Sequence, residues 1–94
     1  MAYRFEWNEA KAKSNLIKHG VSFDEAATVF DDLLARIFED GPHSIEEKRE
    51  LIIGYSVRSH LLIVCFTEQP GERIRIISAR LPTAKERKAY EENT

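Results

Sequence analysis

Apolar and polar residues follow two periods along this chain, and these periods indicate where its helices and strands lie. Aromatic and charged residues alternate from Tyr3 to Trp7, a period of two that predicts a short strand. Short polar segments at 58–60 and 69–72 predict hairpin turns, and residues 41–44 predict a longer loop. Runs of apolar and β-branched residues at strand length lie at residues 35–39, 50–57, 61–68 and 73–80.

Three other segments have the spacing and the capping residues of helices. Asn8 is a good N-cap, and Gly20 can end the helix that it begins. Ser22 and Glu25 form a capping box for a second helix. Thr83, which follows the strand-breaking Pro82, can cap a third. The predicted helices span residues 9–19, 23–31 and 84–92.

The order of these elements predicts the fold class. A strand, two helices, a run of strands and a closing helix indicate an α+β fold with helices packed on one face of a sheet. We therefore expect residues 1–94 to form one small domain, with two N-terminal helices and a C-terminal helix on an antiparallel sheet of about four strands. Residues 51–53 and 61–66 are apolar throughout, which predicts central strands covered on both faces. The arginine-rich run at 73–80 predicts a strand with one wet face.

The composition limits the class of protein. With 43% hydrophobic and 32% charged residues, the chain has the balance of a globular domain. Its longest apolar run, Leu61 to Phe66, is far shorter than the roughly 20 residues of a membrane span. The N-terminus lacks the apolar stretch of a signal peptide, and the single Cys65 cannot form an internal disulfide. These features predict a cytoplasmic protein with no membrane partner, and Cys65 is expected to fill the core.

The charges are segregated along the chain, although the net charge is only −2. Residues 21–47 carry eight acidic residues and one arginine, whereas residues 48–90 carry nine lysines and arginines against four glutamates. Such a distribution allows a basic surface that attracts phosphate on a mildly acidic protein. The alternative interpretation is that the acidic segment is simply a solvated face.

The strong catalytic motifs are missing from the sequence, and what remains is a concentration of arginines. We find no glycine-rich phosphate loop, no zinc-type Cys/His spacing and no nucleophile elbow, so no metal or cofactor is predicted. Arg73 and Arg75 share one side of their predicted strand. By alternation Arg80 falls on the other side of the strand, unless a bulge near Ile76 and Ile77 places it on the side of Arg73 and Arg75. Other cations lie at the turn and on the last helix, namely Arg58, Lys85, Arg87 and Lys88.

Converging guanidinium groups bind phosphate oxygens and stabilise the charge that develops on a phosphorane-like transition state. Such a site can cleave RNA without metal, if a base takes the 2′-OH proton and an acid protonates the leaving 5′-oxygen. Candidates for the proton steps are His19, His60, Glu68, Glu86 and Tyr90.

Simpler interpretations stand beside each of these roles. Paired arginines on a strand also serve solubility or protect a sheet edge. His19 suits the role of a helix C-terminal cation, and Tyr90 could merely anchor the last helix. Trp7 could be a hydrophobic staple before the Asn8 cap rather than a platform for a base.

Several segments are similar to the BrnT family in order and spacing. They are FEWN at 5–8, Lys11, Asn15, KHGVSFDEA at 18–26, VFDD at 29–32, RIRIISAR at 73–80, KER at 85–87 and Tyr90 with Glu91. The resemblance spans nearly the whole chain, and residues 34–47 are its least characteristic part.

The resemblance implies a RelE-like toxin of a type II toxin–antitoxin pair that degrades RNA, free or ribosome-associated, and so blocks translation. It also implies a cognate BrnA-like ribbon-helix-helix antitoxin, through which alone the toxin would contact operator DNA. The catalytic candidates are Arg58, Arg73, Arg75, Arg80, Tyr90 and His19; the RNA-binding candidates are Lys11, Lys85, Arg87 and Lys88.

Two other functions remain as alternatives. A degenerate toxin-like domain could bind RNA or a protein partner without cutting. A DNA-binding regulator is less well supported, because no predicted helix has the exposed basic face of a recognition helix.

Overall fold

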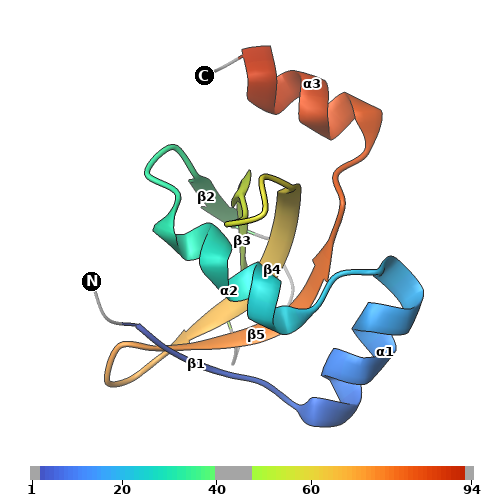
Figure 1. Cartoon of the computed structure of the whole chain (residues 1–94). Helices are drawn as coiled ribbons and strands as arrows, with labels where there is room; N and C mark the ends of the chain where they lie inside the picture. Colours follow the sequence, from blue (N-terminus) through green and yellow to red (C-terminus); the bar gives the residue numbers. More distant parts are fainter. Residues whose placement is uncertain (1–2, 40–47, 93–94) are drawn as a thin grey trace.

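The structure is a computed structural model that describes residues 3–39 and 48–92 (Figure 1). The predicted loop at 41–44 lies outside the described residues. The elements, in chain order, are β1 (Arg4–Glu6), α1 (Glu9–His19), α2 (Phe23–Thr28) with the 3-10 turn η1 (Val29–Asp31), β2 (Arg36–Glu39), β3 (Glu50–Tyr55), β4 (Leu61–Gln69), β5 (Arg73–Arg80) and α3 (Ala84–Glu92). Among the described residues, no helix is both long and apolar enough to cross a membrane.

The predicted helix caps are confirmed. The Asn8 side chain accepts a hydrogen bond from the Lys11 amide, and Gly20 ends α1 in the left-handed conformation with φ 70°. Ser22 caps α2 through the Glu25 amide. The second helix is shorter than predicted, because its α-helical part ends at Thr28 and the chain tightens into η1.

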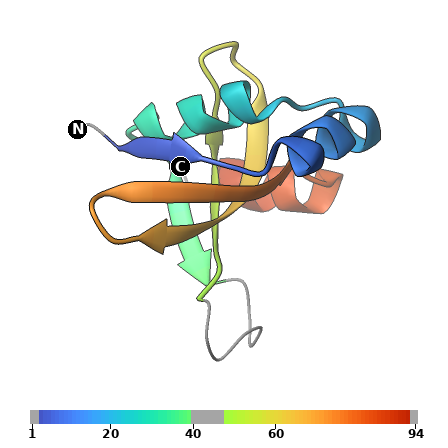
Figure 2. The ribbon, with the colours of Figure 1, turned by 90° about the horizontal axis from the view of Figure 1, so that it is seen from below.

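The sheet has five strands in the order β1-β5-β4-β3-β2, and it is mixed. Strands β2 to β5 are antiparallel, whereas β1 lies parallel to β5 with Arg4 opposite Arg73 and Glu6 opposite Arg75. In Figure 2 the β1 ribbon runs beside β5. The expectation of about four antiparallel strands is therefore wrong in detail. The pattern at the N-terminus predicts a strand but carries no information on the edge that it joins or on its direction.

One face of the sheet, the core face, packs against α1 and α2. Phe23 of α2 and Val29 of η1 are buried there against alternate residues of the central strands. Aromatic rings extend this core, with Phe30 centred 4.9 Å from Phe66 and 5.2 Å from Phe5. The buried strand residues of the core face are Ile52, Leu62, Val64, Phe66, Ile74, Ile76 and Ala79.

The opposite face of the sheet carries a smaller apolar cluster, which α3 covers through Tyr90. Ile53, Leu61 and Ile63 pack there, and their side chains alternate with those of the core face. The prediction that β4 is covered on both faces is confirmed, but the prediction that all helices share one face is wrong for α3. An extended segment after β5 carries α3 away from α1 (Figure 1), and the apolar residues of β3 and β4 on this side need their own cover.

A β-bulge interrupts β5 at Ile77. The pairing with β4 passes from Phe66 opposite Ile76 to Cys65 opposite Ser78, so Ile77 has no partner residue on β4. The bulge reverses the alternation, because Ala79 rejoins the core face and Arg80 joins the side of Arg75. The bulge that is needed to place Arg80 on the same side as Arg73 and Arg75 is thus present.

Candidate functional site

The outer side of β5 gathers the arginines that the sequence singled out. Arg73, Arg75 and Arg80 lie on the sheet side opposite the core face, together with Ser78 and with Glu6 of β1. We call these five residues the arginine face. Arg4, two residues before Glu6 on β1, has the same side by alternation and adds a further cation.

Glu6 links two of these arginines. Arg73 Nη1 lies 3.0 Å from Glu6 Oε1, while Arg75 Nε and Nη2 lie 3.1 and 3.0 Å from Glu6 Oε2. The Glu6 side chain remains 29% exposed, so solvent and ligands can reach the cluster. Sequence reasoning missed Glu6, because its partners lie nearly 70 residues further along the chain and are set by the parallel pairing of β1 with β5.

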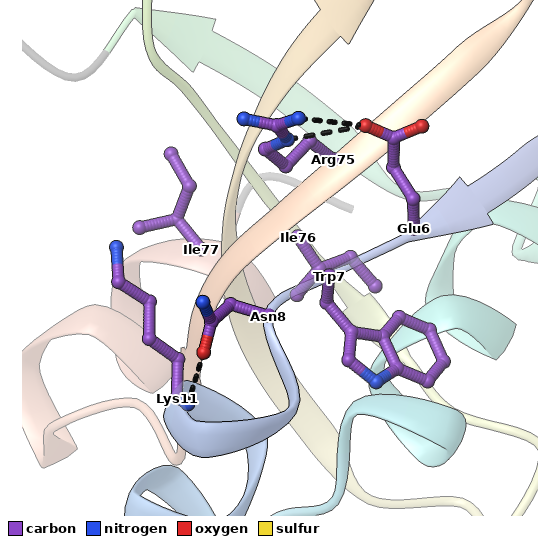
Figure 3. Close-up of a pocket in the computed structure, with 7 residues that line it drawn as sticks. All are labelled: Glu6, Trp7, Asn8, Lys11, Arg75, Ile76 and Ile77. Carbon is purple, nitrogen blue, oxygen red and sulfur yellow. Dashed lines mark hydrogen bonds and ion pairs between the residues drawn. The ribbon is translucent and has the colours of Figure 1, made fainter.

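A pocket of about 340 Å³ opens where β1 ends and α1 begins, beside the bulge. It is lined by Glu6, Trp7, Asn8, Lys11, Arg75, Ile76 and Ile77 (Figure 3). In this view the Arg75 guanidinium and the Lys11 amine lie on one side of β5 and the Trp7 indole on the other, while the Glu6 carboxylate turns one oxygen toward Arg75. That indole packs edge-to-face on Phe23 at 5.9 Å, which favours a core role for Trp7.

Arg80 forms a bidentate pair with Glu86 of α3. Its Nη1 and Nη2 lie 2.8 and 3.0 Å from the two carboxylate oxygens. Glu86 also accepts from the Thr83 amide at 2.8 Å, and the Thr83 hydroxyl accepts from the Glu86 amide, so the two residues form a capping box for α3. The hydrogen bonds from Arg80 and Thr83 lower the pKa of Glu86 to about 2. Glu86 is therefore a carboxylate at neutral pH and cannot be the acid of a proton transfer.

A second polar cluster lies where the β3–β4 turn meets α2. The Ser56 hydroxyl donates to Glu25 Oε2 at 2.6 Å, and His60 Nδ1 lies 2.7 Å from the same oxygen. Burial acts to raise the pKa of Glu25, but the hydrogen bonds from Ser56 and His60 outweigh it and lower the pKa. Arg58 contributes to that shift from the turn. This cluster pins the hairpin to α2, and it also presents an imidazole oriented by a carboxylate.

The remaining predicted residues lie outside the arginine face. Tyr90 is buried against Ile63, the β4 partner of Arg80, and its hydroxyl donates to the Leu34 carbonyl at 3.2 Å. Burial raises the pKa of Tyr90, so its hydroxyl stays a donor at neutral pH. His19 is half-buried in the last turn of α1. Lys85, Arg87 and Lys88 are exposed on α3.

The structure thus places Arg73, Arg75 and Arg80 on one side of β5, the first two held by Glu6 and the third by Glu86, and Lys11 lines the pocket beside Arg75. It places Arg58, His19 and Tyr90 on other elements. Within residues 3–39 and 48–92, no group of three or more His, Cys, Asp or Glu side chains is arranged to hold a metal ion.

Comparison with known proteins identifies a matching family and a similar solved structure. A family model described as "Ribonuclease toxin, BrnT, of type II toxin-antitoxin system" matches residues 7–86. The crystal structure of the Brucella abortus ribonuclease toxin BrnT is similar, with a TM-score of 0.66 at 25% sequence identity, over 87% of this chain and 99% of that one. A search of curated proteins returned no match.

Proposed function

Because the chain belongs to the BrnT family of ribonuclease toxins of type II toxin–antitoxin systems, we propose that it is an endoribonuclease that cuts RNA without a metal ion and so blocks translation. In this proposal residues 1–94 form one RelE-like toxin domain. The family match over residues 7–86 supports the activity, and the arginine face supports its location.

The observation that carries the site is the bulge at Ile77. Without it Arg80 would point to the core face, and with it three guanidinium groups share one exposed surface. Guanidinium groups bind phosphate oxygens bidentately and stabilise the added negative charge of the transition state. We assign Arg73, Arg75 and Arg80 this role, and we assign Lys11 and the α3 cations the binding of flanking phosphates.

The chemistry that fits such a site is transesterification. The 2′-oxygen attacks the neighbouring phosphorus, the bond from phosphorus to the 5′-oxygen breaks, and the ends are a 2′,3′-cyclic phosphate and a 5′-hydroxyl. Arg58, His19 and Tyr90 remain candidates from the sequence for accessory roles, since they lie off the arginine face.

The partner in this proposal is a cognate antitoxin. Type II family membership implies an antitoxin, and we propose a BrnA-like ribbon-helix-helix protein that neutralises the toxin. Operator DNA would be contacted only through that antitoxin. The helix α2 has two acidic residues in its first turn and no basic residue in its last turn, so it lacks the basic surface of a recognition helix.

The experiment is protein synthesis in a cell-free translation extract, with RNA integrity measured in the same tube. The wild type should stop synthesis in the extract, and in a separate reaction with purified RNA it should cut equally well with and without EDTA. The Arg73→Ala/Arg75→Ala/Arg80→Ala variant should lose at least 100-fold in cleavage rate. The variant with Lys in these three positions keeps the charge but loses the bidentate geometry, and it should fall between the two.

Two controls make the result specific. Lys13→Ala/Lys48→Ala removes exposed cations that do not belong to the arginine face and should leave cleavage unchanged. Circular dichroism and thermal unfolding establish that each variant is folded. Intact RNA and normal synthesis with the folded wild type would favour the non-catalytic binding module instead.

A further inference from the structure

We propose that Glu6 is the general base of this ribonuclease, which takes the proton of the attacking 2′-hydroxyl in the pocket between β1, α1 and the bulge. The assignment rests on the proposed function and goes beyond it, because it names the group that performs the first proton step. Nothing in the pattern of the sequence singles this residue out.

The pocket combines the three kinds of group that the reaction needs. Glu6 is the one carboxylate among the described residues that line it, and Lys11 and Arg75 supply two cations beside that carboxylate. In Figure 3 the Arg75 guanidinium and the Lys11 amine lie on one side of β5, and the Glu6 carboxylate turns one oxygen toward Arg75. A volume of about 340 Å³ is enough to admit a ribose with its phosphate.

The hydrogen bonding of Glu6 leaves one position for a substrate. A carboxylate offers about four acceptor positions, two on each oxygen. Oε2 accepts from Arg75 twice, whereas among residues 3–39 and 48–92 Oε1 accepts only from Arg73 Nη1. Oε1 therefore keeps an acceptor position, and the two guanidinium groups hold the carboxylate in a fixed orientation.

The proton balance of the step is simple. The 2′-hydroxyl proton passes to Glu6 Oε1 while the 2′-oxygen forms its bond to phosphorus. The bond to the 5′-oxygen then breaks, and that oxygen takes a proton from solvent water. Arg73 and Arg75, which hold the two oxygens of Glu6, lie where their other N–H groups can bind the non-bridging phosphate oxygens. Glu6 returns its proton to solvent after product release.

The competing base is His60, which Glu25 orients at 2.7 Å. Its surroundings fit RNA less well, because Asp31 and Asp32 line the neighbouring pocket with Tyr55, Ser56 and Val57. Near His60 a phosphate would find Arg58 beside Glu25, with these two carboxylates in the adjoining pocket. At Glu6 it would meet Arg73, Arg75 and Lys11 instead.

The test is a single-turnover pH–rate profile with a short 5′-labelled RNA, for the wild type, Glu6→Gln, Glu6→Asp, His60→Gln and the matched control Glu9→Gln. Glu9 is an exposed neighbour on α1. Glu6→Gln should cut at least 100-fold more slowly and lose the fall in rate on the acid side, while it still binds RNA. Glu6→Asp should keep that acid limb at a reduced rate. Glu9→Gln should match the wild type.

The outcomes separate the two hypotheses. A folded Glu6→Gln that keeps the acid limb and cuts within fivefold of the wild type overturns the assignment of Glu6, and loss of the limb in His60→Gln transfers the role to the Glu25–His60 pair. If Glu6→Gln fails to fold, Glu6→Asp decides, since an unchanged rate in that variant contradicts the proposal. An inactive wild type overturns the proposed function itself, and this assignment with it.

Discussion

The side-chain amide of Asn15 pairs with both backbone groups of Ala79. Asn15 Nδ2 donates to the Ala79 carbonyl at 2.8 Å, and Asn15 Oδ1 accepts from the Ala79 amide at 3.1 Å. The same Nδ2 donates to the Val21 carbonyl at 2.9 Å. Since β1 pairs with β5 only as far as Arg75, the buried Asn15 takes the place of a neighbouring strand at the rest of that edge.

Replacement of Asn15 by leucine should therefore destabilise the protein strongly. The backbone groups of Ala79 and the Val21 carbonyl would be left without partners in the interior, at a cost of about 3 kcal/mol. Urea unfolding measures the loss, with Ser14→Ala on the exposed side of α1 as the control. A loss below about 1 kcal/mol, the usual net worth of one hydrogen bond, would show that the edge does not depend on Asn15.

Ser56→Ala should loosen the β3–β4 turn. The buried Ser56 hydroxyl donates to Glu25 and accepts from the Arg58 and His60 amides, both at 3.2 Å. We expect a loss of about 2 kcal/mol and faster hydrogen exchange at these two amides. Val57→Ala, a change at an exposed neighbour, should leave the exchange rates as they are. Equal hydrogen-exchange rates at these amides in Ser56→Ala and the wild type would contradict the claim that Ser56 holds the turn in place.

Two glycines should respond to alanine for different reasons. A Cβ on Gly54 would lie 2.8 Å from Ala35 Cβ and 3.0 Å from Asp32 Oδ2, so Gly54→Ala forces the core apart at a cost of about 1–3 kcal/mol. At Gly20 nothing lies within 4 Å, and only its φ of 70° resists a side chain, at about 1 kcal/mol. Thermal unfolding of both variants compares the two costs. A larger loss at Gly20 would contradict the close packing at Gly54.

Glu86 should make stability depend on acid pH. Its pKa is about 2 in the folded protein against an ordinary 4.5, so the folded state favours the carboxylate. The contribution is complete above about pH 4.5 and is lost as the pH falls toward 2. Glu86→Gln, which keeps much of the capping box, should be less stable than the wild type at pH 7 by up to about 1 kcal/mol, because both side chains are partly exposed. The melting temperatures of the two proteins should converge near pH 2. If their difference stays the same at every pH, the ionisation of Glu86 is not its cause.

The local structure was predictable wherever one segment carries its own signal. The caps at Asn8, Ser22 and Thr83 place the helix starts, and the hairpin turns place the antiparallel strands. What could not be predicted depends on contacts between distant segments. The parallel docking of β1 on β5 and the placing of α3 on the second face are both set by packing of the whole sheet.

The same distinction between local signals and long-range contacts applies to the candidate site. Arg73 and Arg75 follow from the alternation of one strand, and Arg80 required only a bulge that the sequence allowed. Glu6 could not be found from the sequence, because its importance comes from a register between residues far apart in the chain. Tyr90 is a catalytic candidate from the sequence, but the hydrogen bond from its hydroxyl to the Leu34 carbonyl gives it the contacts of an anchor.

The bulge at Ile77 makes the length of β5 as important as its composition. Side chains of a strand alternate between the two faces of the sheet, so one extra residue moves all later side chains to the other face. Substituting Ile77 changes one side chain at the rim of the pocket. Deleting it would exchange two surfaces at once, because Arg80 would turn toward the core and Ala79 would turn away from Asn15. A deletion of this one residue would thus move every later side chain of β5 to the opposite face of the sheet.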